Sequence, residues 1–277
     1  MNSDIRKSAI AGSWYPSDPK VLKADIERFF SNVADQDING NIIGLVVPHA
    51  GYVYSGQIAA HAYKQIRGEK FDAVIVIGPS HHAYFNGVSV YDQGGYETPL
   101  GVVPIDVPLV KSLVECHELI FSNRAAHRQE HSVEIQLPFL QIALSEFRFV
   151  PLVMGDQSPQ TCEILSECIF ESIENRKVLI VGSSDLSHFH SYDKAVSLDH
   201  LTLSHILKMD GQSLLQDLGG GICEACGGGP IVSTMLASEK LGADNVTVFK
   251  YANSGDVTGD KRSVVGYASV IFTSTVS

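Results

Sequence analysis

The chain has 277 residues, and 20 Lys and Arg stand against 31 Asp and Glu, which gives a formal net charge of −11 at pH 7. No basic cluster offsets this excess of acid, so the composition argues against a nucleic-acid partner. Hydrophobic residues make up 44% and charged residues 18%, as in a compact globular protein. No apolar run approaches the roughly 18 residues of a membrane span. The N-terminal segment also lacks the apolar region of a secretory signal, so we expect a cytoplasmic protein.

Short β-branched runs alternate with longer amphipathic stretches, without a linker or a fixed repeat. The predicted strands are 42–47, 73–77, 88–91, 149–154, 178–181, 246–251 and 264–272. The predicted helices are 19–32, 56–66, 107–116, 131–145, 159–175, 192–208 and 230–241. Because several strands are apolar on both faces, we expect one α/β domain over residues 1–277, a sandwich with a central mostly parallel or mixed sheet covered by helices.

Three of the predicted strands end in polar residues. His49 and His81 each follow a strand, and Ser184-Asp185-Leu186-Ser187-His188 follows another. Ligands of open α/β sheets bind outside the carboxyl ends of the strands, so we expect these residues at one site. A single such histidine is more often a structural residue, but two of them favour a metal site. Asp185 is then a ligand, an orienting group or a helix cap, and His188 a general acid or base.

The five cysteines are odd in number and scattered, which predicts reduced thiols and not a disulfide framework. Cys223 and Cys226 form one Cys-x-x-Cys pair between glycine runs, and a single pair does not make a zinc site. Cys226 directly precedes Gly227-Gly228-Gly229-Pro230 and a predicted helix, where a thiolate is stabilised. We therefore expect Cys226 to be a ligand and Cys223 a structural residue.

His127-Arg128-Gln129-Glu130-His131 matches the H-x-x-E-H pattern of zinc peptidases, which needs both histidines on one helix and the glutamate as general base. Pro138 follows soon after, and a proline disfavours a long helix through this segment. The preferred interpretation places His131 at a helix start, where it reaches the shared site as a supporting group or proton donor. A serine hydrolase based on Ser80 or Ser184 is disfavoured, because the chain has no G-x-S-x-G elbow. It has no glycine-rich phosphate loop either, so no nucleotide is expected.

Aromatic residues near the first two strands are candidates for the wall of a pocket. Trp14 and Tyr54 lie in Trp14-Tyr15-Pro16 and Tyr52-Val53-Tyr54. They could line a pocket for a planar ligand, with ordinary core packing as the alternative. Together with Ser80 and His82, which flank His81, they are the expected substrate-binding residues.

Six segments resemble, in the same order, the Memo family, which comprises the mediator of receptor-driven cell motility and its prokaryotic relatives called AmmeMemoRadiSam system protein B. The segments are 11–16, 48–56, 78–82, 130–134, 184–188 and 226–227. The resemblance runs nearly end to end. It implies a fold similar to that of LigB-type class III extradiol dioxygenases, which hold non-haem iron with two histidines and a glutamate.

The resemblance implies that His49 and His81 are metal ligands, that Cys226 takes the place of the dioxygenase glutamate, and that His188 takes the place of the catalytic histidine. A soft thiolate in place of a carboxylate favours copper, zinc or thiolate-bound iron. We therefore expect iron or copper, with zinc as the alternative, and a redox or oxygen-linked activity. The second hypothesis is a non-enzymatic module that binds a peptide or protein in the same pocket. A radical S-adenosylmethionine protein and an AMMECR-type protein are the partners that the resemblance implies.

Overall fold

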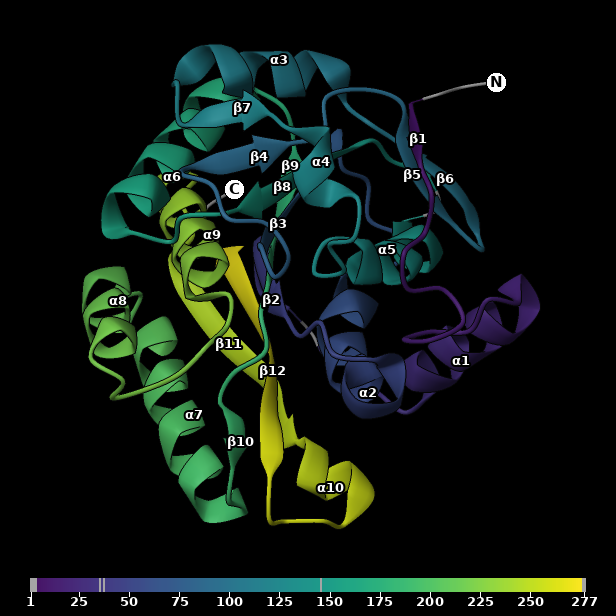
Figure 1. The fold of residues 1–277 in the computed structure, drawn as a ribbon, viewed down its shortest axis with the longest axis vertical. Helices are drawn as coiled ribbons and strands as arrows, with labels where there is room; N and C mark the ends of the chain where they lie inside the picture. The colour runs from purple at the N-terminus through teal and green to yellow at the C-terminus, as the bar shows by residue number, and fades with distance from the viewer. Residues whose placement is uncertain (1–3, 35, 37, 145, 276–277) are drawn as a thin grey trace.

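The computed structural model describes residues 4–34, 36, 38–144 and 146–275. Figure 1 shows a central sheet with α2 and α5 on one side and α6 and α9 on the other. The large sheet has the strand order β10-β12-β2-β9-β3-β8-β4-β7, and β11 also pairs with β12. β2, β9, β3 and β8 run parallel, whereas β12 pairs with β2 and β4 pairs with β8 in the antiparallel direction, so the predicted mixed α/β sandwich is confirmed. No helix in the described part of the chain has both the length and the apolarity to cross a bilayer.

The central strands are buried on both faces, which explains their continuous apolar sequences. The strands of the large sheet are β2 (Asn41–Val47), β3 (Ala73–Pro79), β4 (Val88–Val90), β7 (Ile120–Ser122), β8 (Phe149–Met154), β9 (Val178–Ser183), β10 (His188–His190), β11 (Asn245–Asn253) and β12 (Val264–Ser274). All seven predicted strands belong to this sheet. A second sheet of three short strands consists of β1 (Ile5–Arg6), β5 (Gly95–Thr98) and β6 (Gly101–Pro104).

Several helices begin where a side chain caps the first turn. Asp18 accepts hydrogen bonds from the N–H groups of Lys20 and Val21, and Ser158 caps a helix that starts with a proline. The helices are α1 (Pro19–Ser31), α2 (Tyr52–Tyr63), α3 (Val107–Cys116), α4 (Arg124–His127), α5 (Leu137–Leu144), α6 (Pro159–Ile173), α7 (Tyr192–Leu207), α8 (Gly211–Gly219), α9 (Gly228–Lys240) and α10 (Ser254–Thr258), with 3₁₀ turns η1 (Lys64–Ile66) and η2 (Glu134–Gln136).

The predicted helix 131–145 differs from the structure at its start. Its first regular turn is the 3₁₀ turn η2 and α5 follows, whereas Ser145 lies outside the described residues. The predicted helix 56–66 begins earlier, at Tyr52, and ends as a 3₁₀ turn. The sequence interpretation did not include β1, β5, β6, β7, β10, α4, α8 and α10. Most of these elements are too short to establish a period of their own.

The expectation that all five thiols are reduced is wrong. Cys116 at the end of α3 and Cys168 in α6 form a disulfide across a sequence separation of 52 residues, and Cys162, Cys223 and Cys226 are free. An odd number of cysteines gave no reason to pair these two. Only the packing of α3 against α6 brings them together.

Reduction of the Cys116–Cys168 disulfide is expected to lower the free energy of unfolding by about 2–4 kcal/mol, because the cross-link restricts the unfolded chain. Urea unfolding with and without a reductant measures the difference. Cys116→Ser should show the same loss and no response to the reductant. An unchanged wild-type midpoint in reductant would contradict the prediction.

Candidate functional site

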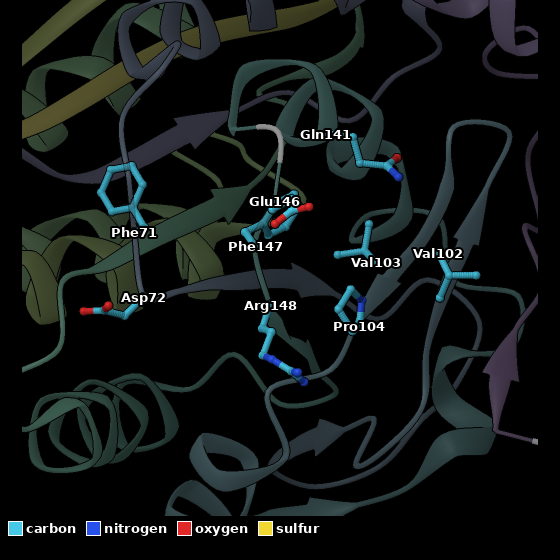
Figure 2. Close-up of a pocket in the computed structure, with 9 residues that line it drawn as sticks. All are labelled: Phe71, Asp72, Val102, Val103, Pro104, Gln141, Glu146, Phe147 and Arg148. Atoms are coloured by element: carbon cyan, nitrogen blue, oxygen red, sulfur yellow. The ribbon is translucent and has the colours of Figure 1, made fainter.

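Two cavities lie at opposite ends of the central strands. A cavity of about 610 Å³ includes Asp72, the residue before β3, and contains none of the predicted site residues. Figure 2 shows its lining of Phe71, Asp72, Val102, Val103, Pro104, Gln141, Glu146, Phe147 and Arg148. A second cavity of about 410 Å³, here called the histidine cavity, lies where the parallel strands end. Its lining is Ser13, Trp14, His49, Ala50, Gly51, Tyr54, His81, His131, Asp185, His188, Val265 and Tyr267.

Strand order explains why three distant segments meet at the histidine cavity. β9 lies between β2 and β3, and all three strands run parallel. His49, His81 and Asp185 each lie two residues beyond the end of their strand. Neighbouring strands are only about 4.8 Å apart, so the three side chains start at the same edge of the sheet. The predicted convergence of the strand ends is therefore present in the structure.

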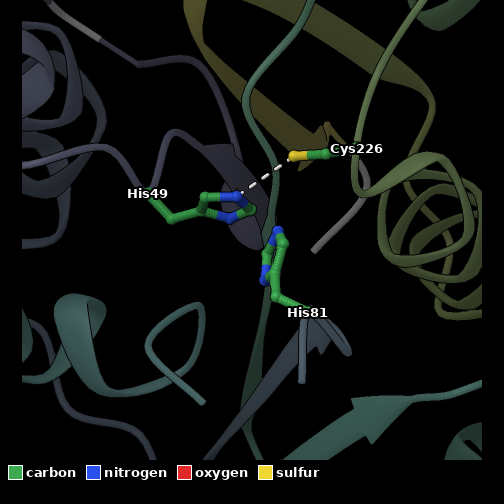
Figure 3. Close-up of side chains that lie close together, drawn as sticks. All are labelled: His49, His81 and Cys226. Carbon is green, nitrogen blue, oxygen red and sulfur yellow. Dashed lines mark hydrogen bonds between the residues drawn. The ribbon is translucent and has the colours of Figure 1, made fainter. Parts of the chain in front are cut away.

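The two strand-end histidines and Cys226 form a compact group of donor atoms. Figure 3 shows the imidazoles of His49 and His81 side by side, with the thiol directed at His49. The distance from His49 Nε2 to Cys226 Sγ is 3.1 Å, and one donor atom from each of the three residues lies within 4.8 Å of the others. Donors around one ion with bonds of about 2.0–2.3 Å lie roughly 3–4 Å apart. The nitrogen and sulfur donors thus fit a soft or borderline metal ion with small adjustments.

The glycine-rich segment before α9 brings Cys226 to this group. The N–H of Cys226 donates to the carbonyl of Asp185 at 3.3 Å, and the N–H of Gly227 donates to Ser184 Oγ at 2.9 Å. A Cβ at Gly227 would lie 2.5 Å from the carbonyl oxygen of Ser183, so only glycine permits this approach. The expected stabilisation of a thiolate at Cys226 is not found, because burial, and then the charge of Asp185, raise the pKa of this thiol to about 12. A metal must therefore displace the thiol proton when it binds.

Hydrogen bonds fix which nitrogen of His49 faces Cys226. Ser183 Oγ donates to the carbonyl of Ser132 at 2.6 Å and accepts from Gln136 Nε2 at 2.8 Å. Because its only proton is used, Ser183 accepts from His49 Nδ1, at 3.0 Å. His49 Nε2 is then unprotonated and points at the thiol. Burial and the neighbouring His81 lower the pKa of His49 to about 3, so the ring is neutral, as a ligand must be.

Glu130 orients His81 in the same manner. Its Oε1 accepts from His81 Nδ1 at 2.9 Å, and its Oε2 accepts from the backbone N–H of His81 at 2.6 Å. Burial alone would raise the pKa of Glu130, but the hydrogen bonds that it accepts from His81 and Ser132 bring the pKa well below the usual range. An ionised Glu130 holds the proton of His81 on Nδ1 and leaves Nε2 free. Carboxylate–histidine pairs of this kind commonly support metal ligands.

His131 lies in the histidine cavity, as expected. Its ring stacks on that of His81 with centroids 4.4 Å apart, and the Trp14 ring lies 4.3 Å away on a tilted plane. Burial and the neighbouring His49 lower the pKa of His131 to about 3, so its imidazole is neutral at physiological pH. His131 therefore contributes a neutral ring beside the ligands, and Trp14 lines the cavity as predicted.

Asp185 and His188 have different surroundings. Asp185 Oδ1 accepts from the N–H groups of His49 and Ala50 at 2.8 and 3.3 Å, so this carboxylate fixes the turn that carries His49. It is not part of the compact donor group found among the described residues. Burial raises the pKa of Asp185 to about 6, although the hydrogen bond from the backbone N–H of His49 acts to lower it. His188 lines the histidine cavity and also a smaller one of about 280 Å³ that it shares with Cys226.

Two of the expected substrate-binding residues do not line the histidine cavity. Ser80 Oγ donates to the carbonyl of Ala83 at 2.7 Å and closes a turn. The His82 ring is exposed, with its centroid 6.1 Å from that of His131. Trp14 and Tyr54 are in the lining, so only half of that predicted set surrounds the cavity.

The helix required by the zinc-peptidase interpretation does not form. α4 ends at His127, and His131 lies beyond it. The two nitrogens of His127 are hydrogen-bonded to Tyr96 and Ser89 at 2.6 and 3.0 Å, away from the donor group. Glu130 and His131 belong to the histidine cavity and its support, so the H-x-x-E-H residues serve two different environments.

Arg6 holds this segment in place. It donates to the carbonyls of His127 and Glu130 at 2.5 and 2.6 Å and forms a buried ion pair with Glu134 at 2.5 Å. The sequence interpretation gave Arg6 no role, because its partners lie more than 120 residues away. Ser183 was missed as well, although its position directly before the Ser184–His188 segment was a local signal.

Acid is expected to destabilise the fold through Glu134. Burial alone would raise its pKa, but the charge of Arg6 and hydrogen bonds from Ala9 and Ser8 bring it below the ordinary value. A carboxyl group with a lowered folded-state pKa stabilises the native state above its unfolded pKa of about 4.3, and this contribution is lost as pH falls through the folded value. Urea unfolding between pH 6 and pH 3 should show a smaller acid-induced loss in Glu134→Gln than in wild type. Equal losses would contradict this assignment.

Known proteins resemble this chain over nearly its whole length. The family model described as "Memo-like protein" matches residues 6–271. The chain belongs to the Memo-like protein family. A "MEMO1 family protein" from Methanobrevibacter smithii is 38% identical over 280 residues, covering 97% of this chain and 99% of the relative. Another from Sulfolobus acidocaldarius is 39% identical over 285 residues, with the same coverage of 97% and 99%.

A solved structure extends the likeness to the fold. An uncharacterized protein from Escherichia coli K12 superposes with a TM-score of 0.59 at 14% identity, covering 83% of this Memo-like chain and 99% of that chain. At this level of identity the similarity concerns the architecture alone.

Proposed function

We propose that this protein binds iron or copper, with zinc as the alternative, through Nε2 of His49, Nε2 of His81 and Sγ of Cys226. The observation that supports the proposal is the grouping of these donor atoms, each from a different segment, within 4.8 Å of one another. The hydrogen bonds to Nδ1 of both histidines add to it, because each leaves Nε2 available as a ligand atom. We propose a redox, oxygen-linked reaction as the activity of the site.

Iron or copper would supply one-electron chemistry with oxygen, and the chain supplies position and proton transfer. Asp185 keeps the His49 turn fixed through two backbone N–H groups. His188 faces the cavity that would hold a substrate and is the candidate acid or base. His131 and Trp14 form one wall of this cavity and exclude water from one side of the donors.

Elemental analysis of protein purified without oxygen tests the metal site. Wild type should contain close to one equivalent of iron or copper, and Cys226→Ser should lose most of it, because a hydroxyl is a poor substitute for a thiolate. Cys223→Ser is the matched control, since this buried free thiol is outside the donor group. It should retain wild-type metal content.

A metal-free wild type, or equal metal content in wild type and Cys226→Ser, would overturn the metal proposal. Oxygen uptake by the loaded protein in the presence of catechol-like compounds tests the redox step separately. No uptake with full metal content would reject that step and leave the metal site in place.

The second candidate function is a binding module for a peptide or protein. It is favoured by the exposed side chains of Val53 and Tyr54, 78% and 43% accessible, of which Tyr54 lines the histidine cavity. The probes are purified AMMECR-type and radical S-adenosylmethionine proteins, which are the partners that the family resemblance implies. The cytoplasmic location stays a prediction. Under this hypothesis Cys226→Ser loses metal and keeps the partner, whereas a purely catalytic site binds neither probe.

A further inference from the structure

The charged groups of the histidine cavity have an unusual balance. Its described lining contains one carboxylate, Asp185, and neither lysine nor arginine. Four histidines, His49, His81, His131 and His188, make up most of its remaining polar lining. The cavity of Figure 2 instead contains Arg148 with Asp72 and Glu146, and a third cavity has Arg6, Lys7, Arg124 and Arg128 in its lining. Of these three cavities, the histidine cavity alone has a carboxylate and no lysine or arginine in its described lining.

Asp185 has one oxygen to spare. Its Oδ1 accepts two backbone N–H groups, whereas Oδ2 has no hydrogen-bond partner among the described residues. Asp185 is buried and belongs to the lining of the cavity. A carboxylate oxygen that no protein group occupies accepts most strongly from a charged donor, so Asp185 favours a positively charged ligand group.

Aromatic side chains form the rest of the wall. Trp14, Tyr54 and Tyr267 all line the cavity. The faces of tryptophan and tyrosine rings attract cations, and aromatic walls are used to bind organic ammonium groups. They also pack against planar apolar bodies. An anionic ligand would meet ring faces and a carboxylate of its own sign.

We propose that the histidine cavity binds an organic cation, an amine whose ammonium group pairs with Asp185 Oδ2 and whose apolar body lies against Trp14 and Tyr54. The proposal goes beyond metal binding and does not depend on it, because the residues that recognise the amine are outside the donor group. The net charge of −11 adds a long-range attraction for cations.

Trp14 is the only tryptophan of the chain, so its fluorescence reports directly on occupancy of the cavity. Metal-free protein at pH 8 is titrated with benzylamine, benzyl alcohol and benzoate, which share a ring and differ in charge. Benzylamine should bind at least about tenfold more tightly than benzyl alcohol, and benzoate should bind most weakly. Equal binding of the three, tighter binding of benzoate, or no response to benzylamine would overturn the proposal.

Two variants identify the groups responsible. Asp185→Asn should reduce the preference for benzylamine over benzyl alcohol to about threefold or less, because the charge is lost. Tyr54→Leu should weaken benzylamine binding more than benzyl alcohol binding. Asp72→Asn is the matched control, as it removes a carboxylate at the opposite end of β3, in the cavity of Figure 2. A control that loses the preference as strongly as Asp185→Asn would contradict the assignment.

The ligand series on wild type tests the proposal even where Asp185→Asn disturbs the His49 turn. Because the titrations use metal-free protein, their outcome is separate from that of the elemental analysis. Amine binding without metal binding would retain this inference and reject the metal site, and the reverse result would do the opposite.

Discussion

Glu134→Gln is expected to lower the free energy of unfolding by about 3–5 kcal/mol, because it leaves the buried charge of Arg6 without its counter-ion. Both side chains of the pair are almost fully buried. Glu134 also accepts hydrogen bonds from the N–H of Ala9 at 2.8 Å and from the hydroxyl of Tyr15 at 2.7 Å. The amide of glutamine presents N–H groups where these donors need an acceptor, so several bonds are lost together.

Urea unfolding at pH 7 measures this change, and Glu97→Gln is the matched control. Glu97 pairs with Lys7 at 2.5 Å on the surface, where both side chains are exposed. Exposed ion pairs contribute about 0–1 kcal/mol, so the control should unfold nearly as wild type does. If Glu134→Gln changed stability by no more than Glu97→Gln, the role assigned to the buried pair would be wrong.

The sequence predicted the sheet and the ends of its strands because these features are local. Short, uninterrupted β-branched runs such as 73–77 favour strands of a covered sheet, and a histidine just past such a run is placed by the strand itself. His49 and His81 could therefore be assigned to one edge without knowledge of the contacts. Asp185 lies at the same position relative to its strand, two residues past the end of β9.

The supporting contacts could not be predicted, because they join segments far apart in sequence. Arg6 and Glu134 are separated by 128 residues, and His49 and Ser183 by 134. No local pattern marks such pairs, whose members are ordinary polar residues until the fold brings them together. The Cys116–Cys168 disulfide escaped prediction for the same reason.

The H-x-x-E-H segment shows how a correct residue can be assigned a wrong environment. The motif predicts one helix with two ligands, but the helix ends at His127 and the chain then turns. Arg6 accounts for this path, since its guanidinium binds the carbonyls of His127 and Glu130. A helix continuing through this segment would use these carbonyl groups for its own hydrogen bonds. A contact from the N-terminus therefore decides the local structure.

Glu130→Gln is expected to weaken metal binding about 10- to 100-fold, the usual effect of removing a partner of a metal-binding histidine. Glu130 accepts from His81 through both oxygens and also from the N–H of Ser132 at 2.9 Å. Glutamine has only one acceptor oxygen. If that oxygen keeps the bond from the backbone N–H of His81, the amide N–H takes the place of Oε1 and faces His81 Nδ1. The proton then moves to Nε2, and the ring can no longer bind a metal through that atom.

Competition with a chelator of known affinity measures the change, after circular dichroism has shown that the variant is folded. Asp217→Asn is the matched control, because it alters a similar pair, His205 Nε2 to Asp217 Oδ2 at 2.8 Å, whose histidine is not in the donor group. The control should bind metal as wild type does. Unchanged affinity in Glu130→Gln would mean that His81 is held without the carboxylate, and loss of peptide cleavage in this variant would instead favour the zinc peptidase, in which Glu130 is the general base.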